Sequence, residues 1–304
     1  MPTPASGHPP IATSVKAVAE TSRSGANALE IPSSDVYRVI SHQACTGGTL
    51  ISRFLASYRK VALISEVSPD GPDQFVRFDP FMPISQLGSL NVVESRKQRD
   101  ALFMDQLALA QRWCRISDRS LILREHAHST YMVSARKIRG IQRCIPAGAV
   151  TKSVITVRHP LSSYLSLIKS FPHEYLDFNH YCERYINYIS KNASVPRFRY
   201  EDFCQNAGET AGKILAALDL KARDLGIQDD WASVSLTGNS GRHRDSTVIV
   251  IPTVEKEAIS QGEKLGRVSP PYQQLCDLLD YDADYRRFAR GQNRKAQHAA
   301  NQQL

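Results

Sequence analysis

The sequence predicts an α/β protein, a single three-layer domain with a central, mainly parallel sheet flanked by helices. Short β-branched, apolar runs alternate with longer segments of helical spacing, which is typical of parallel strands joined by crossover helices. The chain has 304 residues, 42% hydrophobic and 22% charged, values that favour a folded domain over a disordered chain. This length gives room for one large α/β domain with a sizeable core.

The first expected strand begins at Val36 and reads VYRVIS, a β-branched, apolar run that ends before a pair of glycines. The other expected strands are residues 61–64, 121–124, 153–157 and 197–200. Helical spacing of apolar residues predicts helices over residues 99–115, 129–139, 161–169, 178–190 and 209–218, with further helical patterns from residue 254 and over 272–279.

The two ends of the chain differ from the middle. Residues 1–33 are rich in Pro, Ala, Ser, Thr and Gly without stable periodicity, so we expect a flexible N-terminal segment that cannot repay its ordering entropy. The α/β domain is expected to span residues 34–285. Residues 286–304 are expected to form a basic polar tail, with the cations Arg286, Arg287, Arg290, Arg294 and Lys295.

Charge, cysteines and hydropathy limit the function classes. With 38 Lys+Arg, 30 Asp+Glu and a net charge of +8, the protein should attract anions. The six cysteines are scattered without a CxxC pair, which argues against a zinc ribbon or a disulfide scaffold and favours a reducing compartment. No apolar run reaches membrane-helix length and no secretory signal is visible, so we expect a cytoplasmic protein, with a transit peptide as an open option.

The segment SHQACTGGTL, residues 41–50, follows the first strand and opens a helix. Gly47 and Gly48 permit close approach of the backbone to an oxyanion, and Thr46 and Thr49 add hydroxyl donors at the helix N-terminus. A P-loop-like anion site is therefore predicted, while a tight turn with glycines for packing stays an open alternative. The segment matches neither GxxxxGK[ST] nor GxGxxG, which argues against a nucleotide kinase or a nicotinamide dehydrogenase.

A second candidate anion site follows the strand at residues 153–157, which runs into RHPLSSYLS. Pro160 suits the first turn of a helix. The fork of donors on Arg158 suits a phosphate, and Ser166 lies about two turns further along, so both can converge on one anion. An ordinary ion pair with a capping serine is the alternative. Two anion sites at strand carboxyl ends match the ligand-binding edge of open α/β sheets.

Three features together resemble the sulfotransferases that use 3′-phosphoadenosine-5′-phosphosulfate (PAPS): HQACTGGTL, the spacing of Arg158 and Ser166, and FRYEDF. The resemblance runs from Val36 to about Phe203, and a weaker similarity continues to about residue 282. It implies that the first loop binds the 5′-phosphosulfate, that Arg158 and Ser166 bind the 3′-phosphate, and that Tyr200 lies near the adenosine. The loop residues so implied are Cys45, Thr46, Gly47, Gly48, Thr49 and Leu50.

The sequence departs from this family at several positions. Many cytosolic members carry a lysine where this chain has Cys45 and a tryptophan where it has Leu50. Stabilising charge for the transferred group must then come from elsewhere, with His42, Arg53 and Arg124 as candidates. The late Arg-Lys-Gly motif of the family is absent. Residues 237–242 are the candidate substitute, in which the guanidinium of Arg242 is expected to bind the phosphate.

Residues 121–128, LILREHAH, end a predicted inner strand with polar groups. On an extended chain Arg124, His126 and His128 share one face. Arg124-Glu-His126 resembles the family pattern Lys-x-His, which implies that His126 is the general base and Arg124 a cation near the transferred group. The alternatives are a metal site at His126 and His128, or a structural histidine. Glu66 is expected as a solvated loop carboxylate rather than a substrate contact.

The sequence thus predicts a PAPS-dependent sulfotransferase that acts on a hydroxyl or amine of a small-molecule or glycan acceptor and requires no metal. Sulfuryl transfer needs in-line positioning and charge neutralisation more than covalent help, by analogy with phosphoryl transfer. One alternative is an inactive nucleotide-binding protein, suggested by the missing loop lysine. The other is a nucleic-acid binder that uses the basic tail, which no recognised nucleic-acid motif accompanies.

Overall fold

The computed structural model describes residues 36–67, 95–125, 140–146, 148–170, 177–227, 234, 236, 254 and 256–301. The chain divides into two units, Met1–Ile31 and Pro32–Leu304, and all described residues belong to the second. The expected flexible segment, residues 1–33, and the expected helix over 129–139 lie outside the described residues.

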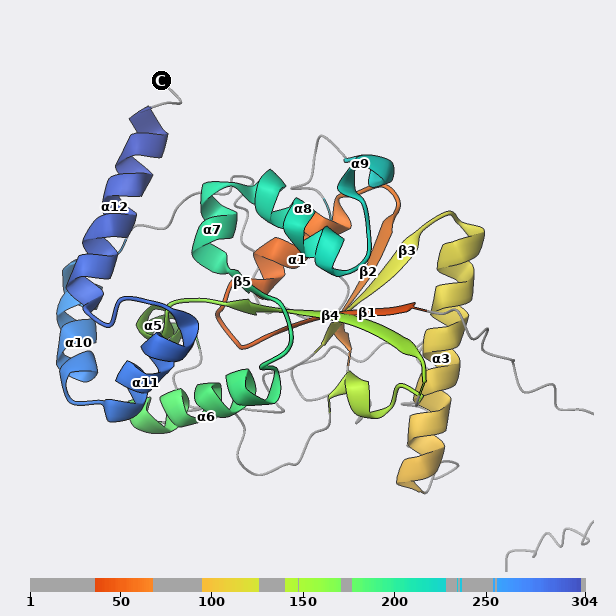
Figure 1. Ribbon diagram of the computed structural model, residues 1–304, viewed down its shortest axis with the longest axis horizontal. Coiled ribbons are helices and arrows are strands. Elements are labelled where there is room, and N and C mark those ends of the chain that lie inside the picture. Colours follow the sequence, from red (N-terminus) through yellow and green to blue (C-terminus); the bar gives the residue numbers. More distant parts are fainter. Residues whose placement is uncertain are drawn as a thin grey trace, which may run out of the picture. The chain divides into compact units, whose positions relative to one another are not determined.

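A five-stranded sheet forms the centre of the fold (Figure 1). Its strands are β1 (Val36–His42), β2 (Val61–Val67), β3 (Ser120–Glu125), β4 (Val150–Val157) and β5 (Arg197–Arg199). The strand order is β2-β3-β1-β4-β5, and every pairing within this sheet is parallel. The predicted α/β class with a parallel central sheet is therefore confirmed.

The described helices are α1 (Gly48–Ala56), α3 (Arg96–Ile116), η1 (Ile141–Arg143), α5 (Pro160–Ser170), α6 (Phe178–Lys191), α7 (Tyr200–Gln205), α8 (Ala207–Ala217), α9 (Ala222–Leu225), α10 (Lys256–Arg267), α11 (Pro270–Leu279) and α12 (Tyr285–Asn301). One boundary differs from the expected strand over residues 197–200, because Tyr200 begins α7. Arg199 takes the extended conformation of an N-cap, and Glu201 and Asp202 place carboxylates in the first turn, where the helix dipole favours them.

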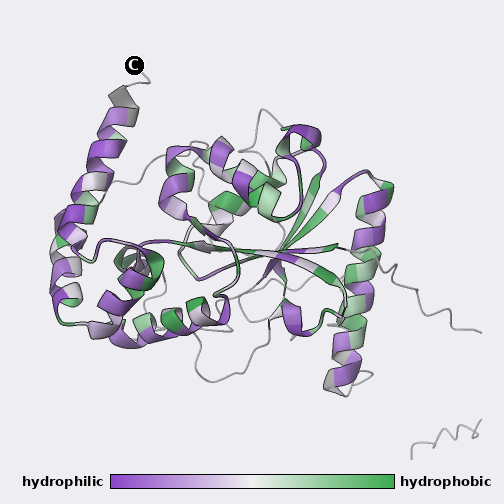
Figure 2. Ribbon diagram, in the orientation of Figure 1, coloured by the Kyte–Doolittle hydropathy of each residue, from purple (hydrophilic) through white to green (hydrophobic). Residues whose placement is uncertain are grey.

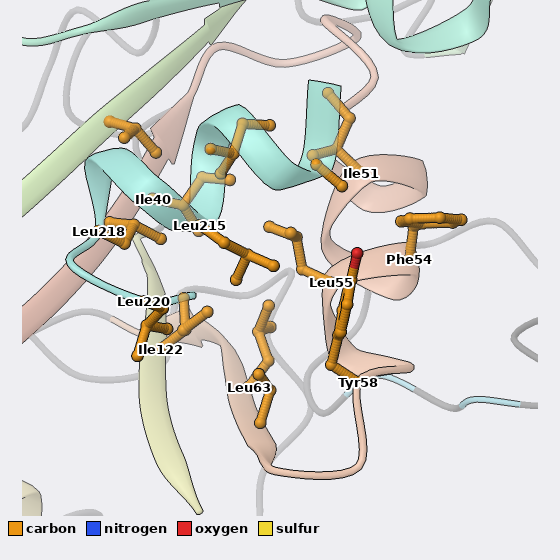
Figure 3. Packing of buried hydrophobic residues seen from close by; sticks show 14 of the residues in the cluster. Ile40, Ile51, Phe54, Leu55, Tyr58, Leu63, Ile122, Leu215, Leu218 and Leu220 are labelled. Atoms are coloured by element: carbon orange, nitrogen blue, oxygen red, sulfur yellow. The ribbon is translucent and has the colours of Figure 1, made fainter. Parts of the chain in front are cut away.

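Helices α1 and α8 cover one face of the sheet. Ile51 and Leu55 of α1 and Leu215 of α8 pack with strand residues in one buried cluster (Figure 3). To this cluster β1 contributes Ile40, β3 contributes Ile122 and β4 contributes Val154. Burial of this apolar area holds α1, and with it the preceding loop, in a fixed position over the sheet.

The other face of the sheet carries two further clusters. Phe103 and Leu107 of α3 pack against Val39 and Leu123. Helices α5, α6 and α11 pack against Ile155 and Val157, with a contribution from residues of the C-terminal segment. Because helices cover both faces, the domain has three layers.

Helix α12 covers most of the stretch expected as a basic polar tail, residues 286–304. Its arginines are exposed, and in Figure 2 its ribbon is mainly purple, the colour of hydrophilic residues. Tyr285 and Ala289 are nevertheless buried, and the side-chain amide of Asn293 exchanges two hydrogen bonds with the backbone of Val254. In the described part of the chain, no helix has the length and hydropathy needed to cross a membrane.

The topology has a switch point at the carboxyl ends of β1 and β4. These strands are neighbours, but α1 leaves β1 toward one face and α5 leaves β4 toward the other. Such a switch point is where open α/β sheets bind ligands. The glycine loop and Arg158 both lie at this edge.

Candidate anion-binding site

The glycine loop between β1 and α1 is tightly constrained on both sides. Gly47 is the N-cap of α1 with a φ of 82°, a conformation that favours glycine. A Cβ at Gly47 would overlap the ring of Tyr200, and a Cβ at Gly48 would overlap the ring of His42. Both glycines are therefore required by packing, as the simple-turn alternative expects, and within the described residues no side chain hydrogen-bonds as an N-cap of α1.

Part of the loop is held by its own hydrogen bonds. Thr46 is fully buried, and its hydroxyl donates to the backbone oxygen of Gln43 at 2.8 Å. The proton that we expected Thr46 to offer to an anion is thus engaged inside the loop. Cys45 has a φ of 63°, so left-handed residues alternate along the loop at Cys45 and Gly47. Such alternation turns successive N–H groups toward one concavity.

Arg158 joins the two predicted anion sites. Its Nη1 donates to the backbone oxygen of Cys45 at 3.1 Å, and its guanidinium carbon lies 4.8 Å from the centroid of the Tyr200 ring. The Tyr200 ring is buried between this guanidinium and Gly47, and burial raises the pKa of its hydroxyl. Ser166 lies two turns into α5, partly exposed. The structure therefore brings the loop, Tyr200 and Arg158 together.

Arg124 lies at the end of β3, and its side chain contacts the first turn of α1. Its Nη2 donates to Thr49 Oγ1 at 3.2 Å, and its Nη1 donates to Ser65 Oγ at 2.7 Å. Nη1 also lies 2.8 Å from Glu66 Oε1 in a buried ion pair. Burial lowers the pKa of Arg124, and Glu66 opposes that shift. The guanidinium of Arg124 therefore contacts Thr49, the residue after the glycine pair, although the loop itself lacks a lysine.

The other two candidate cations are placed differently. Nε2 of His42 lies 2.9 Å from Nε and 2.7 Å from Nη2 of Arg124. A guanidinium only donates, so this nitrogen of His42 accepts, and its lone pair is not free to take a proton. Arg53 lies in the last turn of α1, away from the glycine loop at the helix N-terminus. Arg124 contacts Thr49 in the first turn of α1.

Glu66 does not have the solvated position that the sequence suggested. Its side chain is 9% exposed and pairs with Arg124. The residue has a φ of 59°, where the register of β2 against β3 shifts between Ile64 and Val67. Strained backbone at a non-glycine residue is concentrated at functional sites. The bulge turns this carboxylate inward, a feature that strand periodicity does not reveal.

Two buried polar side chains near the loop were not singled out from the sequence. Gln43 directly follows β1 and is fully buried, and neither atom of its amide has a hydrogen-bond partner in the described part of the chain. The hydroxyl of Thr156, on β4 opposite His42, is also buried without a partner there. Most buried polar groups are hydrogen-bonded, so two such exceptions at the carboxyl ends of neighbouring strands need an explanation. The only sequence signal was their position at the ends of apolar strands.

Several predicted site residues lie outside the described residues. These are His126, the expected base, His128, Arg242 and the remaining residues of 237–242. Among residues that the structure describes, no cluster of His, Cys, Asp or Glu has the arrangement of a metal site.

The fold and the loop together define an α/β protein of the P-loop-like kind, with a glycine loop between the central strand and its helix. No protein-family model matches the sequence, and no curated protein matches it. Among solved structures, three sulfotransferase domains resemble the chain, each over 82% of its length.

The first is a sulfotransferase domain from the curacin biosynthetic pathway, at 13% identity, a TM-score of 0.47 and 99% coverage of that domain. The second is a sulfotransferase from Alicyclobacillus acidocaldarius, at 14% identity, a TM-score of 0.42 and 98% coverage. The third is a sulfotransferase domain from the olefin synthase of Synechococcus PCC 7002, at 13% identity, a TM-score of 0.37 and 96% coverage.

Proposed function

We propose that this protein is a sulfotransferase that takes its sulfuryl group from PAPS. The observation that carries the proposal is the contact between Arg158 and the glycine loop, in which Nη1 reaches the carbonyl of Cys45. This contact brings an arginine fork and a helix N-terminus to one strand edge, so that one ligand with two anionic groups can span them.

The residues present suit such a ligand. Amides of Gly48 and Thr49 open α1 and would face the 5′-phosphosulfate, and Arg158 with Ser166 would face the 3′-phosphate. The Nε atom of Arg158 is buried and has no partner within the described residues. A buried donor of this kind is suited to a phosphate oxygen. Arg242 remains a proposed further contact.

The donor nucleotide supplies an activated sulfuryl group whose transfer needs charge neutralisation more than covalent help. In this chain Arg124 and the loop amides would hold that charge, with Arg124 fixed by Thr49 and Glu66. His126, two residues beyond Arg124, would take the proton of an acceptor hydroxyl or amine.

The substitution Gln43→Leu should have opposite effects on protein stability and on nucleotide affinity. The change removes a buried amide without partners, so we expect the nucleotide-free protein to become more stable by about 1 kcal/mol or more. If the amide serves the ligand, affinity for 3′-phosphoadenosine-5′-phosphate (PAP) should fall in the same variant. Thermal unfolding and calorimetric titration measure the two effects, and Thr156→Val is the matched comparison. A more stable variant with unchanged PAP affinity would exclude Gln43 from the site.

The proposal itself is tested by calorimetric titration with PAP, beside AMP and ATP. We expect micromolar binding that requires the 3′-phosphate. Arg158→Ala should weaken PAP binding about 100-fold, because two charge-assisted hydrogen bonds are lost. Arg290→Ala, at an exposed position of α12, is the matched control and should leave the affinity unchanged. Equal affinity for PAP and AMP in the wild type would overturn the proposal.

The replacement of the loop lysine by Cys45 supports a second candidate, a nucleotide-binding protein without turnover. That candidate predicts the same preference for PAP but no sulfate transfer to any acceptor. The contact of Arg124 with Thr49 supports the active enzyme, because it brings a guanidinium to the first turn of α1. Incubation with labelled PAPS and a panel of alcohols, amines and glycans distinguishes the two candidates.

A further inference from the structure

The turn that carries Arg158 is fastened by a buried carboxylate. Glu201, in the first turn of α7, is 4% exposed. Its Oε1 accepts a hydrogen bond from the backbone N–H of His159 at 3.1 Å, and its Oε2 accepts one from the Tyr281 hydroxyl at 2.6 Å. One side chain therefore links the end of β4 to the connection between α11 and α12.

His159 extends this link into the C-terminal segment. The residue is fully buried, and its Nε2 lies 3.2 Å from the backbone oxygen of Asp282. Its ring stacks on Phe288 at a centroid distance of 4.0 Å and an interplanar angle of 27°. The residue next to Arg158 is thus enclosed by side chains more than a hundred positions away in the sequence.

Arg199, the residue before α7, also contacts the connection between α11 and α12. Its Nη2 donates to the backbone oxygen of Asp280 at 2.5 Å, and its guanidinium carbon lies 4.7 Å from the Tyr281 ring centroid. Tyr281 is therefore held between Arg199 and Glu201. Such fixed packing restricts the backbone on both sides of Tyr281.

The contacts of Arg158 that the structure describes run to the glycine loop, to Tyr200 and to α6. Its backbone N–H donates to the Tyr185 hydroxyl at 3.3 Å, and its guanidinium lies over Tyr200. The direction in which its fork points therefore depends on the backbone of the Arg158–His159 peptide. Groups that fix that backbone reduce the ordering cost when an anion binds.

We propose that Glu201 is a positioning residue that orients Arg158 for the 3′-phosphate by tying the His159 amide to Tyr281. This inference rests on the proposed function and deepens it. Glu201 and Tyr281 do not touch the nucleotide in this scheme. They hold the turn from which the arginine fork projects.

The test compares PAP with AMP in variants of this link. In Tyr281→Phe one hydroxyl is lost, and in Glu201→Leu both acceptor oxygens are lost. Both variants should bind PAP about tenfold or more weakly, a typical coupling between distant groups, while AMP affinity stays unchanged. Partial unfolding would lower the apparent affinity for both nucleotides equally, so the PAP to AMP ratio reports orientation alone. Glu209→Leu, an exposed carboxylate on α8 paired with Lys213, is the matched control.

The two proposals fail in different ways. If the wild type prefers PAP and both variants keep that preference, the positioning role of Glu201 is wrong and the proposed function stands. If the wild type shows no preference, the proposed function fails and the positioning role falls with it. Tyr281→Phe removes only one hydroxyl, so it keeps the test decisive if the Glu201 variant does not fold.

Discussion

Arg124→Met is expected to lower the rate of sulfate transfer about 100- to 1000-fold and to lower the free energy of unfolding by about 3 to 5 kcal/mol, the cost of breaking a buried ion pair at one partner. The substitution leaves Glu66 buried without its cation, since the side chains of the pair are 6% and 9% exposed. It also removes the donor that Ser65 and Thr49 share. Chemical denaturation measures the loss of stability.

The double variant Arg124→Met/Glu66→Gln separates stability from catalysis. Once the carboxylate is neutral, no unpaired charge stays buried, so most of the lost stability should return. Turnover should stay about 100- to 1000-fold below that of the wild type, the usual cost of losing one group that stabilises transition-state charge. Wild-type turnover in this double variant would show that Arg124 has only a structural role.

Arg38 provides the matched control for Arg124. It is a half-buried arginine on β1 near the opposite end of the strand, where its Nε donates to the backbone oxygen of Leu218 at 2.9 Å. Burial lowers its pKa, as it does for Arg124. Arg38→Met should lower stability but leave turnover per folded molecule unchanged.

Much of the fold was predictable because periodicity and turn chemistry are local. The strands at β1, β3 and β4 lie where β-branched runs predicted them, and the glycine pair lies between β1 and α1 as expected. Helix α3 begins at Arg96, earlier than its predicted start, because Ser95 and Gln98 form a capping box. That box was readable in the sequence as Ser-x-x-Gln.

The site was less predictable because its main contacts are long-range. The contact of Arg158 with Cys45 and the role of Tyr200 as the packing partner of Gly47 depend on which strands are neighbours. The inward turn of Glu66 depends on a bulge that no residue pattern marks. For α12, the run of arginines indicated a tail, whereas the buried Tyr285 and Ala289 on its other side fasten it to the domain.

His159 illustrates the same limit most clearly. The sequence gives a histidine before a helix-opening proline, a position that is ordinarily partly exposed. The His159 ring is buried against Tyr281, Tyr285 and Phe288, which belong to the C-terminal segment. Desolvation in this aromatic surrounding, together with the nearby charge of Arg158, lowers the pKa of His159 to about 3, against an opposing contribution from the Asp282 carbonyl.

This buried imidazole predicts loss of stability in mild acid. The unfolded chain binds a proton at His159 near pH 6.5 and the folded chain only near pH 3, so stability from this group is complete above pH 6.5 and falls as the pH decreases toward 3. The loss is about 1.4 kcal/mol per pH unit in that window, or about 2 kcal/mol between pH 6.5 and 5.

Urea unfolding between pH 7 and 4.5 measures this slope. His159→Phe keeps an aromatic ring against Phe288 but cannot titrate, so its stability should vary less with pH, at the expense of the bond to the Asp282 carbonyl. Equal slopes in the wild type and in His159→Phe would show that the pKa of His159 is the same in the folded and the unfolded chain.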